Sequence, residues 1–414
     1  MVSLRSLLTT RGRSFVGAGV TLALSGIFFG FRDLTRFGVL LLLLPFASAL
    51  LVRSRRTRLR IERHVSPQRM SVDQTARVTL TFENVSSTAT PVFLAEERLE
   101  YALGDRPRFL VDRIAPGRVE TVSYWVHPLL RGRQALGPLT VKVEDPFGLA
   151  NRTAVLEDHT DLVVLPRVLP LATSRQPSSG VGSEGEQAHL IALHGEDDVT
   201  VREYREGDDL RRIHWPSTAR TGEIMVRQED RPAQRRAVVL LDPRPDAHGG
   251  DGPAGSFEWA VTAAASVAAH LNLFGYAVHL VCAETAADGS SAETMTTEEI
   301  LDVLAITEER SDAAADEILT TAQSLAATGG FLVAIIGPRD PEFTARIASL
   351  RQPGTTGLAF VLDAGDFGPS VAESGGPHAD ALQMAGWRAV SVGRDETIAR
   401  AWAVLNAATV GGGR

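Results

Sequence analysis

Two long apolar runs near the start of the chain predict a pair of membrane-spanning helices. The first covers residues 15–31 and the second residues 37–52, and neither contains a charged side chain. At about 1.5 Å per helical residue, each run is roughly 25 Å long, which is near the lower limit for crossing a bilayer. The short segment between them allows only a tight turn. We therefore expect a helical hairpin, in which each backbone satisfies its own hydrogen bonds within the lipid.

Two alternatives to a spanning hairpin stay open. A cleaved signal peptide would account for the first run, but a second apolar run follows at once and no small-x-small pattern precedes Arg32. A hairpin that dips into one leaflet would fit the short runs and Pro45 in the second one. Gly26 and Gly30 also match a spacing that is typical of helix packing in membranes.

The charge distribution predicts an orientation for the hairpin. Residues 1–63 carry 11 Arg against two acidic residues, whereas the whole chain has a net charge of −8. Arg side chains flank both outer ends of the hairpin, and those in its turn, Arg32 and Arg36, are offset by Asp33. The positive-inside rule then predicts two helices in the cell membrane with both chain ends in the cytoplasm. A basic apolar end on an acidic body favours a lipid bilayer, bound through residues 15–52, over nucleic acid.

Beyond the hairpin the hydrophobic period changes to two, which predicts short β-strands. The alternation is clearest at residues 76–84, 119–128 and 138–146, and turn-forming residues such as the DPFG sequence separate the strands. We expect a small antiparallel β-sandwich over residues 59–168.

From residue 235 onward, apolar strands alternate with amphipathic helices. Strands are expected in segments 235–245, 331–338 and 356–364, and the segment 256–275 has its apolar side chains on one helical stripe. This alternation predicts a doubly wound, mainly parallel α/β sheet.

The chain is therefore expected to have four parts. They are a hairpin with basic flanks at 1–58, a β-sandwich at 59–168, a linker with a charged block at 169–234 and an α/β domain at 235–414. The linker contains a G-x-G-x-x-G sequence at 180–185. A dinucleotide site needs a strand directly before these glycines and a helix directly after them, so a flexible linker is the better interpretation.

The charged block, residues 194–230, interleaves Arg and acidic residues around His214 and Trp215. Its pattern predicts two strands with one helical turn between them that ends near Pro216. No activated nucleophile accompanies His214, and no G-x-S-x-G sequence occurs in the chain, so no catalytic residue is expected. We interpret the block as a structural element in which Trp215 is largely buried. Its surface also suits protein binding, because Arg and Trp are frequent interface anchors.

This block resembles the signature of a bacterial family called domain of unknown function 58. The family pattern is approximately R-x-Y-x-x-G-D-x-x-R-x-I-H-W-x-x-x-A-R-x-G-x-x-x-V-R. The matching positions are Arg202, Tyr204, Gly207, Asp208, Arg211 or Arg212, Ile213, His214, Trp215, Ala219, Arg220, Gly222, Val226 and Arg227. Family members are also similar in having two N-terminal membrane helices and a β domain with RRG-like and DPFGL elements, here at 131–133 and 145–149. Pro216 departs from the pattern, which usually has a basic residue there.

The resemblance implies a von Willebrand factor A-like fold for the C-terminal domain and a MoxR-type AAA+ ATPase as protein partner. The metal site of that fold uses D-x-S-x-S after the first strand, whose oxygens bind a divalent ion. Here Asp242, Arg244 and Asp246 stand at these positions, and Asp340 follows a later strand. Both serines are missing, and Arg244 would bring a positive charge to the place of the cation. We therefore expect no metal and no cofactor.

Three functions remain for this chain. The first is a membrane-anchored, non-enzymatic adaptor that presents its cytoplasmic α/β domain to a protein partner. The alternative is a metal-dependent, von Willebrand factor A-type ligand-binding protein, against which the missing serines count. A hydrolase is the third, against which the absence of a nucleophile–base pattern counts. The single cysteine, Cys282, lies in a buried strand pattern and is interpreted as a core residue.

Overall fold

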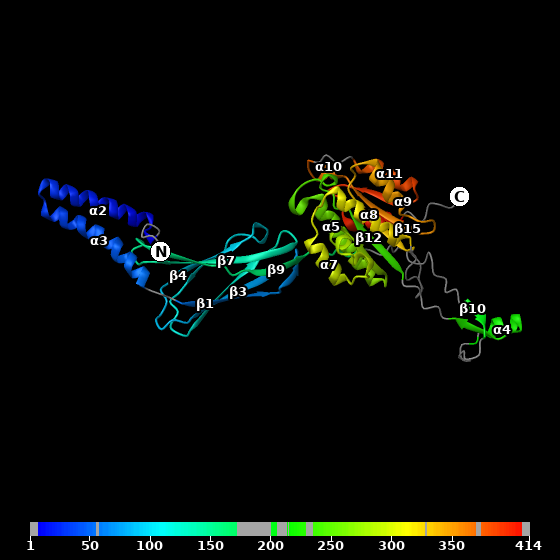
Figure 1. The fold of residues 1–414 in the computed structure, drawn as a ribbon, viewed down its shortest axis with the longest axis horizontal. Coiled ribbons are helices and arrows are strands. Elements are labelled where there is room, and N and C mark those ends of the chain that lie inside the picture. The colour runs from blue at the N-terminus through cyan, green and yellow to red at the C-terminus, as the bar shows by residue number, and fades with distance from the viewer. Residues whose placement is uncertain are drawn as a thin grey trace, which may run out of the picture. The chain divides into compact units, whose positions relative to one another are not determined.

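The computed structural model describes residues 7–54, 58–171, 200–204, 213, 215–228, 235–327, 329–369 and 374–407. The chain divides into two compact units, Met1–Leu165 and Pro166–Arg414 (Figure 1). The division into four parts stays a prediction.

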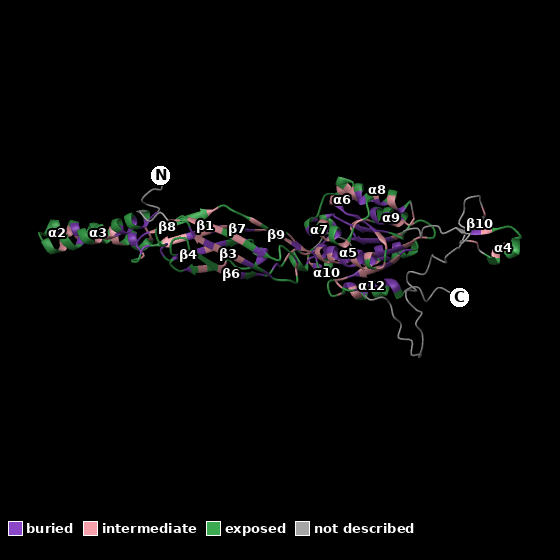
Figure 2. Cartoon of the chain, turned by 90° about the horizontal axis from the view of Figure 1, so that it is seen from below, coloured by how far each residue is buried: buried purple, intermediate pink, exposed green. Residues whose placement is uncertain are grey.

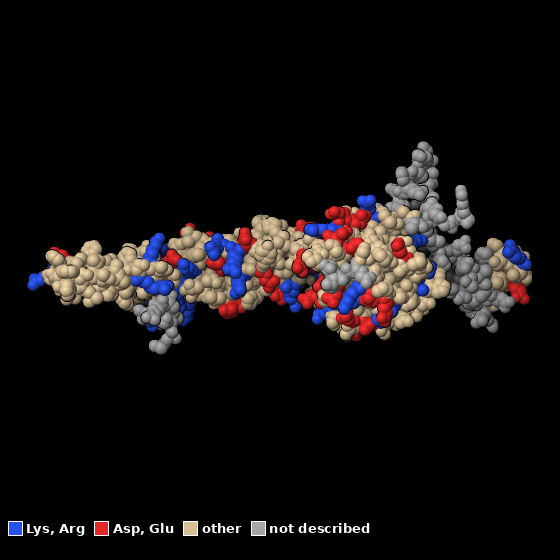
Figure 3. All heavy atoms as spheres, turned by 90° about the horizontal axis from the view of Figure 1, so that it is seen from above, with Lys and Arg blue, Asp and Glu red and all other residues tan. Residues whose placement is uncertain are grey.

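The first unit begins with two long helices, α2 (Thr10–Phe29) and α3 (Arg32–Ser54), which lie side by side as a hairpin (Figure 1). Both are long and apolar enough to cross a membrane. Their apolar spans are only 17% and 28% buried, so most of these side chains are exposed, unlike those of a core helix (Figure 2). On the face seen in Figure 3, charged atoms lie near the two ends of the hairpin and the length between them is uncharged. The predicted pair of apolar helices is confirmed.

Glycines let the two helices approach closely. A Cβ atom added to Gly38 of α3 would lie 2.5 Å from the backbone nitrogen of Ala23, and one added to Gly26 would lie 2.6 Å from that of Thr35. Gly30 has a different structural role, because it is the C-cap of α2 and adopts the left-handed conformation at φ 73°. The expected Gly26–Gly30 packing pair is therefore half wrong, since the turn between the helices needs Gly30 for its positive φ.

Two β-sheets complete the first unit. One contains β1 (Leu59–Ser66), β3 (Ala76–Asn84) and β6 (Val119–Val126). The other contains β2 (Arg69–Ser71), β9 (Thr160–Leu165), β7 (Gly132–Glu144), β4 (Phe93–Leu99) and β5 (Arg108–Val111), with β8 (Asn151–Leu156) paired to β7. All pairings are antiparallel except that of β2 with β9. Alternate side chains of both sheets enter one core that includes Phe82 and Phe93, as the period-two pattern predicts.

A charged pair is buried in this core. Glu97 of β4 is fully buried and accepts a hydrogen bond from Nε of Arg63 at 2.5 Å and another from the hydroxyl of Tyr124. Burial and the neighbouring Glu97 charge raise the pKa of Tyr124. β4 is not predicted by the hydrophobic pattern, because its two glutamates and its arginine obscure the apolar alternation.

The second unit has a five-stranded parallel sheet in the order β13 (Ala277–Val281), β12 (Arg236–Leu241), β14 (Phe331–Ile336), β15 (Thr356–Leu362) and β16 (Arg388–Val392). One face is covered by α5 (Ser256–Leu273), α7 (Thr297–Ile306) and α12 (Ile398–Ala407). The other is covered by α6 (Ala283–Asp288), α8 (Asp312–Ala326), α9 (Pro341–Ser349) and α11 (Gly375–Met384), and α10 (Ala364–Phe367) follows β15.

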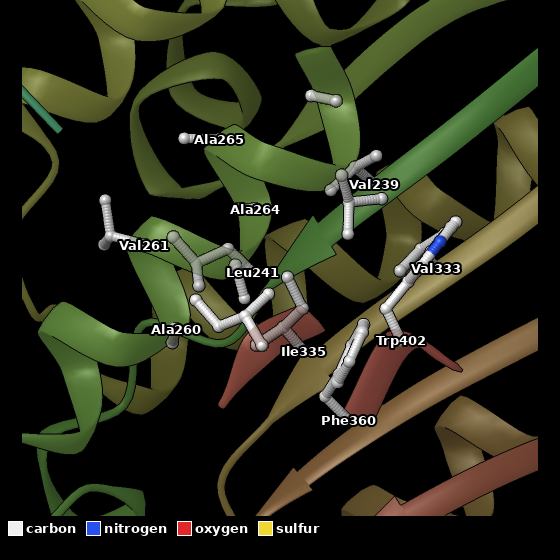
Figure 4. Packing of buried hydrophobic residues seen from close by; sticks show 14 of the residues in the cluster. Val239, Leu241, Ala260, Val261, Ala264, Ala265, Val333, Ile335, Phe360 and Trp402 are labelled. Atoms are coloured by element: carbon white, nitrogen blue, oxygen red, sulfur yellow. The ribbon is translucent and has the colours of Figure 1, made fainter. Parts of the chain in front are cut away.

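This arrangement is the expected doubly wound sheet, and its chain order is 2-1-3-4-5. Figure 4 shows α5 packing its small side chains, including Ala260 and Ala264, toward Val239 and Leu241 of β12. The von Willebrand factor A-like assignment stays a prediction. In sheets of this kind the strand order reverses between the first and third strands, and ligands bind at the carboxyl ends of the strands there. Here that point lies between β12 and β14.

Candidate functional site

The first candidate site is a cluster of charged side chains at the carboxyl ends of β12 and β14, which are parallel neighbours. Asp242 directly follows β12 and is fully buried. Asp340 begins α9, where its side chain caps the helix by accepting a hydrogen bond from the backbone of Phe343 at 2.6 Å. The sheet therefore brings together two carboxylates that are nearly a hundred residues apart in the chain.

Arg244 lies between these carboxylates. Its Nε donates to one oxygen of Asp242 at 3.0 Å, and a terminal nitrogen donates to the other at 2.8 Å. The second terminal nitrogen donates to Asp340 at 3.0 Å. The backbone N–H of Gly337 also donates to Asp242 at 3.2 Å, and the backbone carbonyl of Gly337 accepts from Arg244 at 3.2 Å. The planar guanidinium group thus binds Asp242 through two parallel hydrogen bonds.

The surroundings of Arg244 favour its charged form. Burial by itself lowers the pKa of a guanidinium, but the hydrogen bonds to Asp242 and the charges of Asp242 and Asp340 outweigh that effect and raise the pKa of Arg244. The ring of Phe343 covers the guanidinium, whose central carbon lies 3.5 Å from the ring centroid. Arg244 therefore occupies, as a permanent cation, the space between the two carboxylates that a divalent ion would need.

Asp246 lies apart from this cluster. Its carboxylate pairs with Arg339 at 3.4 Å, and its side chain is 56% exposed. Arg339 also donates to Asp312 at 2.6 Å. Of the four positions predicted from the resemblance, the structure thus brings together Asp242, Arg244 and Asp340 and leaves Asp246 at the surface. Within the described residues, no group of three or more His, Cys, Asp or Glu side chains could hold a metal ion.

His248 belongs to the same neighbourhood, although no sequence motif marks it. Its Nε2 lies 3.0 Å from the carbonyl oxygen of Asp242, and its Nδ1 lies 3.1 Å from the hydroxyl of Ser256. A carbonyl can only accept, so Nε2 carries the proton and Nδ1 accepts from Ser256. Burial lowers the pKa of His248 and outweighs the raising effect of Asp242, so the neutral form of the ring is favoured. A lone histidine in a loop offers no sequence signal for this role.

A serine beside a histidine invites comparison with a hydrolase. Ser256 is fully buried and also accepts the backbone N–H of Gly249 at 3.0 Å. The far nitrogen of His248 faces a backbone carbonyl, where a nucleophile–base pair would have a carboxylate to orient it. The group therefore holds the loop after β12 against the start of α5.

The second candidate site is the part of the charged block that the structure describes. β10 (Thr200–Glu203) and β11 (Met225–Gln228) form an antiparallel pair, and α4 (Trp215–Thr221) lies between them in sequence (Figure 1). Tyr204 donates its backbone N–H to Ile224 at 2.8 Å, and the hydroxyl of Thr218 accepts from the backbone of Met225 at 3.0 Å. The strands expected here are thus present, with Val226 buried.

Two expectations about this block are wrong. Trp215 was expected to be largely buried, but it is 69% exposed, because it lies in the first turn of a short helix none of whose residues is buried. The helical turn was also expected to end near Pro216, whereas Pro216 is the second residue of α4. Proline is tolerated in the first turn of a helix, where its missing N–H has no partner to lose.

Exposed side chains surround Trp215 on α4. Arg220, near the end of the same helix, is exposed as well. The side chains of Arg202 and Arg227 lie outside what the structure describes. Their backbones lie on the paired strands, where Arg202 is opposite Val226 and Val201 is opposite Arg227. The remaining signature residues, Gly207, Asp208, Arg211, Arg212 and His214, and the linker with its G-x-G-x-x-G sequence, lie outside the described residues.

Comparison with known proteins identifies the charged block. Residues 200–308 match the model of the family described as "Protein of unknown function DUF58". Over this segment the chain is similar to the DUF58 family. The resemblance read from the signature is thereby confirmed, while the match does not reach the hairpin or the β-sandwich. A Bacillus subtilis (strain 168) protein described as "Uncharacterized protein YeaD" is 27% identical over 129 residues, which is 30% of this chain and 31% of that protein.

Two solved structures align with parts of this chain at low similarity. The CARDB domain of a Pyrococcus furiosus protein, solved with di-metal ions, aligns at 13% identity and a TM-score of 0.19 over 26% of this chain and 93% of that one. A β-glucosidase from Listeria innocua in complex with glucose aligns at 12% identity and a TM-score of 0.17 over 26% of this chain and 16% of that one. TM-scores this low establish no shared fold.

Proposed function

We propose that this protein is a membrane-anchored, non-enzymatic adaptor whose α4 surface binds a protein partner. The observation that carries the proposal is the 69% exposure of Trp215 within the segment that matches the DUF58 family model. A large indole ring that is exposed to water does not contribute the folding free energy that its burial would provide. Tryptophan and arginine are the residues that most often dominate binding energy at protein interfaces, and Arg220 is exposed on the same helix.

The strand-end cluster supports an adaptor over a metal-dependent receptor. In a receptor of that kind, carboxylate oxygens must be free to bind the ion. Here both oxygens of Asp242 accept hydrogen bonds from Arg244, and Asp340 accepts from Arg244 and from the backbone of Phe343. We include in the proposal a von Willebrand factor A-like character for residues 235–414, with Arg244 in place of the ion that this fold uses.

The anchor of the proposed adaptor is the hairpin of α2 and α3. Its exposed apolar spans and its charged ends suit a bilayer, and the Arg residues on its outer flanks, including Arg11, Arg13 and Arg53, favour a cytoplasmic location for both chain ends. A reporter that fluoresces only in the cytoplasm, fused after Arg414, is expected to be bright. Activity of a reporter that works only outside the cytoplasm, fused at the same place, would contradict this orientation.

The proposed partner is a MoxR-type AAA+ ATPase, a proposal that rests on the family resemblance. The test is binding of the purified ATPase, with and without ATP, to the full-length chain held in lipid nanodiscs. We expect Trp215→Ala to weaken binding at least tenfold, because truncation of a central interface aromatic costs about 2 kcal/mol or more. Arg220→Ala is expected to weaken binding less.

Trp125 provides a matched control, because it is another largely exposed tryptophan. It lies on β6, 53% exposed, with the guanidinium of Arg77 at 4.6 Å from its ring. Trp125→Ala is expected to leave ATPase binding unchanged. If Trp215→Ala binds the ATPase as tightly as the wild type, the α4 surface is not the binding site. If the wild type does not bind it at all, the named partner is wrong.

A further inference from the structure

The DPFGL segment of the β-sandwich joins the sandwich to the hairpin. The backbone N–H of Thr9 donates to the carbonyl of Leu149 at 3.0 Å, and its hydroxyl donates to the carbonyl of Gly148 at 2.7 Å. Leu8 and Ala150 form an antiparallel bridge. The same Thr9 hydroxyl accepts from the backbone of Gly12 at 3.1 Å and so caps α2. Helix cap and turn are thus one hydrogen-bonded structure.

The contact is close and involves both helices. A Cβ atom on Gly12 would overlap the carbonyl oxygen of Leu149, so only glycine fits at that position of α2. Ala49 and Val52 of α3 pack with Ala150 in a small buried cluster. The turn therefore has a fixed place beside the end of the hairpin where α2 begins and α3 ends.

The turn is held in one shape by Asp145. This carboxylate is buried, and its two oxygens accept the backbone N–H groups of Phe147 at 2.9 Å and Ala150 at 2.5 Å. Gly148 has a φ of 66°, which L side chains rarely adopt. The side chain of Phe147 is 62% exposed. The hydrogen bonds that hold the turn use Asp145 and backbone groups, so none of them requires an exposed aromatic ring.

The position of the turn along α2 matches the lipid headgroup layer. The apolar run begins at Phe15, six residues after Thr9, which is about 9 Å along a helix. Since the run is slightly shorter than a typical hydrocarbon core of roughly 30 Å, the bilayer boundary falls a little outside Phe15. The headgroup layer extends for about 5–8 Å beyond that boundary, which is the level of Thr9 and of the turn bonded to it.

Arg11 adds a basic group at this level. It is exposed in the first turn of α2, and one of its terminal nitrogens lies 3.9 Å from where a Cβ on Gly148 would stand. An exposed aromatic ring next to an exposed arginine suits the headgroup layer, where rings meet the apolar boundary and cations meet phosphate. We propose that turn 145–150 is a second membrane contact, with Phe147 inserted into the headgroup layer and Arg11 bound to lipid phosphate. This proposal rests on the proposed membrane anchor.

The test measures depth in the bilayer on the full-length chain, reconstituted into vesicles of phosphatidylcholine and phosphatidylglycerol. Cysteines for a nitroxide label are introduced one at a time in a Cys282→Ala background. Phe147→Cys reports the turn. Leu24→Cys, at a 62% exposed position near the middle of the apolar run 15–31, reports the hairpin. Tyr101→Cys is the aqueous reference, because Tyr101 is 91% exposed and follows the end of β4 that pairs with the start of β7, away from turn 145–150.

Accessibility to oxygen and to a water-soluble nickel chelate then separates the outcomes. We expect the label at 24 to be deep, the label at 101 to be fully accessible to the chelate, and the label at 147 to be several-fold less accessible to it than the label at 101. Raising the share of phosphatidylglycerol should increase protection at 147, and Arg11→Gln should remove that dependence. A label at 147 that is as accessible as the one at 101, with the label at 24 deep, overturns the second contact and leaves the anchor standing. A label at 24 that is accessible to the chelate overturns both.

Discussion

The strand-end cluster around Arg244 and the α4 surface around Trp215 both combine arginine with an aromatic ring, and they differ in burial. The side chain of Arg244 is 3% exposed, and its guanidinium donates to Asp242 and Asp340 under the ring of Phe343. Trp215 is 69% exposed on a helix with no buried residue. The comparison teaches that residue types alone do not separate a structural role from a binding role. The surroundings of each side chain do.

The largest effect is expected from removing the buried guanidinium. Arg244→Ala leaves the buried carboxylate of Asp242 without its two hydrogen bonds from the side chain, a loss that costs about 3–5 kcal/mol for a buried pair. The free energy of opening of β12 and β14, measured by native-state hydrogen exchange on the full-length chain, should fall by that amount.

Arg244→Lys is the matched control for this prediction. A lysine keeps the charge but cannot make two parallel hydrogen bonds to Asp242, so it should recover only part of the loss. If Arg244→Ala exchanges like the wild type in β12 and β14, the cluster is not structural, and the contrast with Trp215 disappears.

A smaller effect is expected from pH, through His248. Burial lowers the pKa of His248 from its ordinary value of 6.5, so the folded chain disfavours the charged ring while the unfolded chain accepts the proton. The contribution of the neutral ring to stability is therefore fully present above pH 6.5 and is lost as the pH falls through the folded-state pKa. The urea midpoint of β12, read by a pulse of hydrogen exchange at one fixed pH, should drop between pH 7.5 and 5.5.

His248→Gln separates this group from the other titrating residues. Glutamine can still donate to the carbonyl of Asp242, but it does not titrate. The variant should lose less stability than the wild type over the same pH interval. Equal losses in the two proteins would mean that another group causes the pH dependence.

Hydrophobic periodicity predicted much of the fold. It missed elements in which charged or small residues interrupt the apolar pattern. The strand expected at 76–84 is β3 and the helix expected at 256–275 is α5, because the apolar positions that predicted them are buried. β4 was missed because Glu97 occupies a core position, with Arg63 as its partner from another strand. α11 was missed because its first residues are two glycines and a proline.

In the candidate site, only the features that follow from the charge of a side chain could be predicted from the sequence. The charge of Arg244 next to Asp242 already spoke against a cation, and the structure shows how the guanidinium fills the space between the carboxylates. The separation of Asp246 from that cluster depends on Arg339, which is distant in sequence. The exposure of Trp215 depends on what packs over α4, and the signature pattern carries no information about that.

Substitution of Arg339 tests whether the contribution of Arg244 to stability comes from its burial or from its ion pairs. It too binds two carboxylates, those of Asp246 and Asp312, but the side chains are 34%, 56% and 63% exposed. Ion pairs this exposed contribute about 0–1 kcal/mol because water and salt screen them. Arg339→Ala should therefore change the opening free energy of β14 by no more than this amount. A loss as large as that of Arg244→Ala would show that the charge network, and not burial, stabilises this end of the sheet.

The smallest effect on stability is expected from truncation of Trp215, the exposed member of the compared pair. An exposed ring loses little packing on truncation, so Trp215→Ala should alter unfolding by less than about 0.5 kcal/mol, as surface substitutions usually do. Trp387 is the matched control, because it is 3% exposed and packs where a Cβ on Gly357 would lie 2.7 Å from its ring. Trp387→Ala should cost about 3–5 kcal/mol, the usual loss for a buried large aromatic. Hydrogen exchange of the strands and thermal unfolding of the full-length chain measure both variants. If Trp215→Ala proves as destabilising as Trp387→Ala, the ring is covered by another part of the chain, and its role as a partner contact loses its basis.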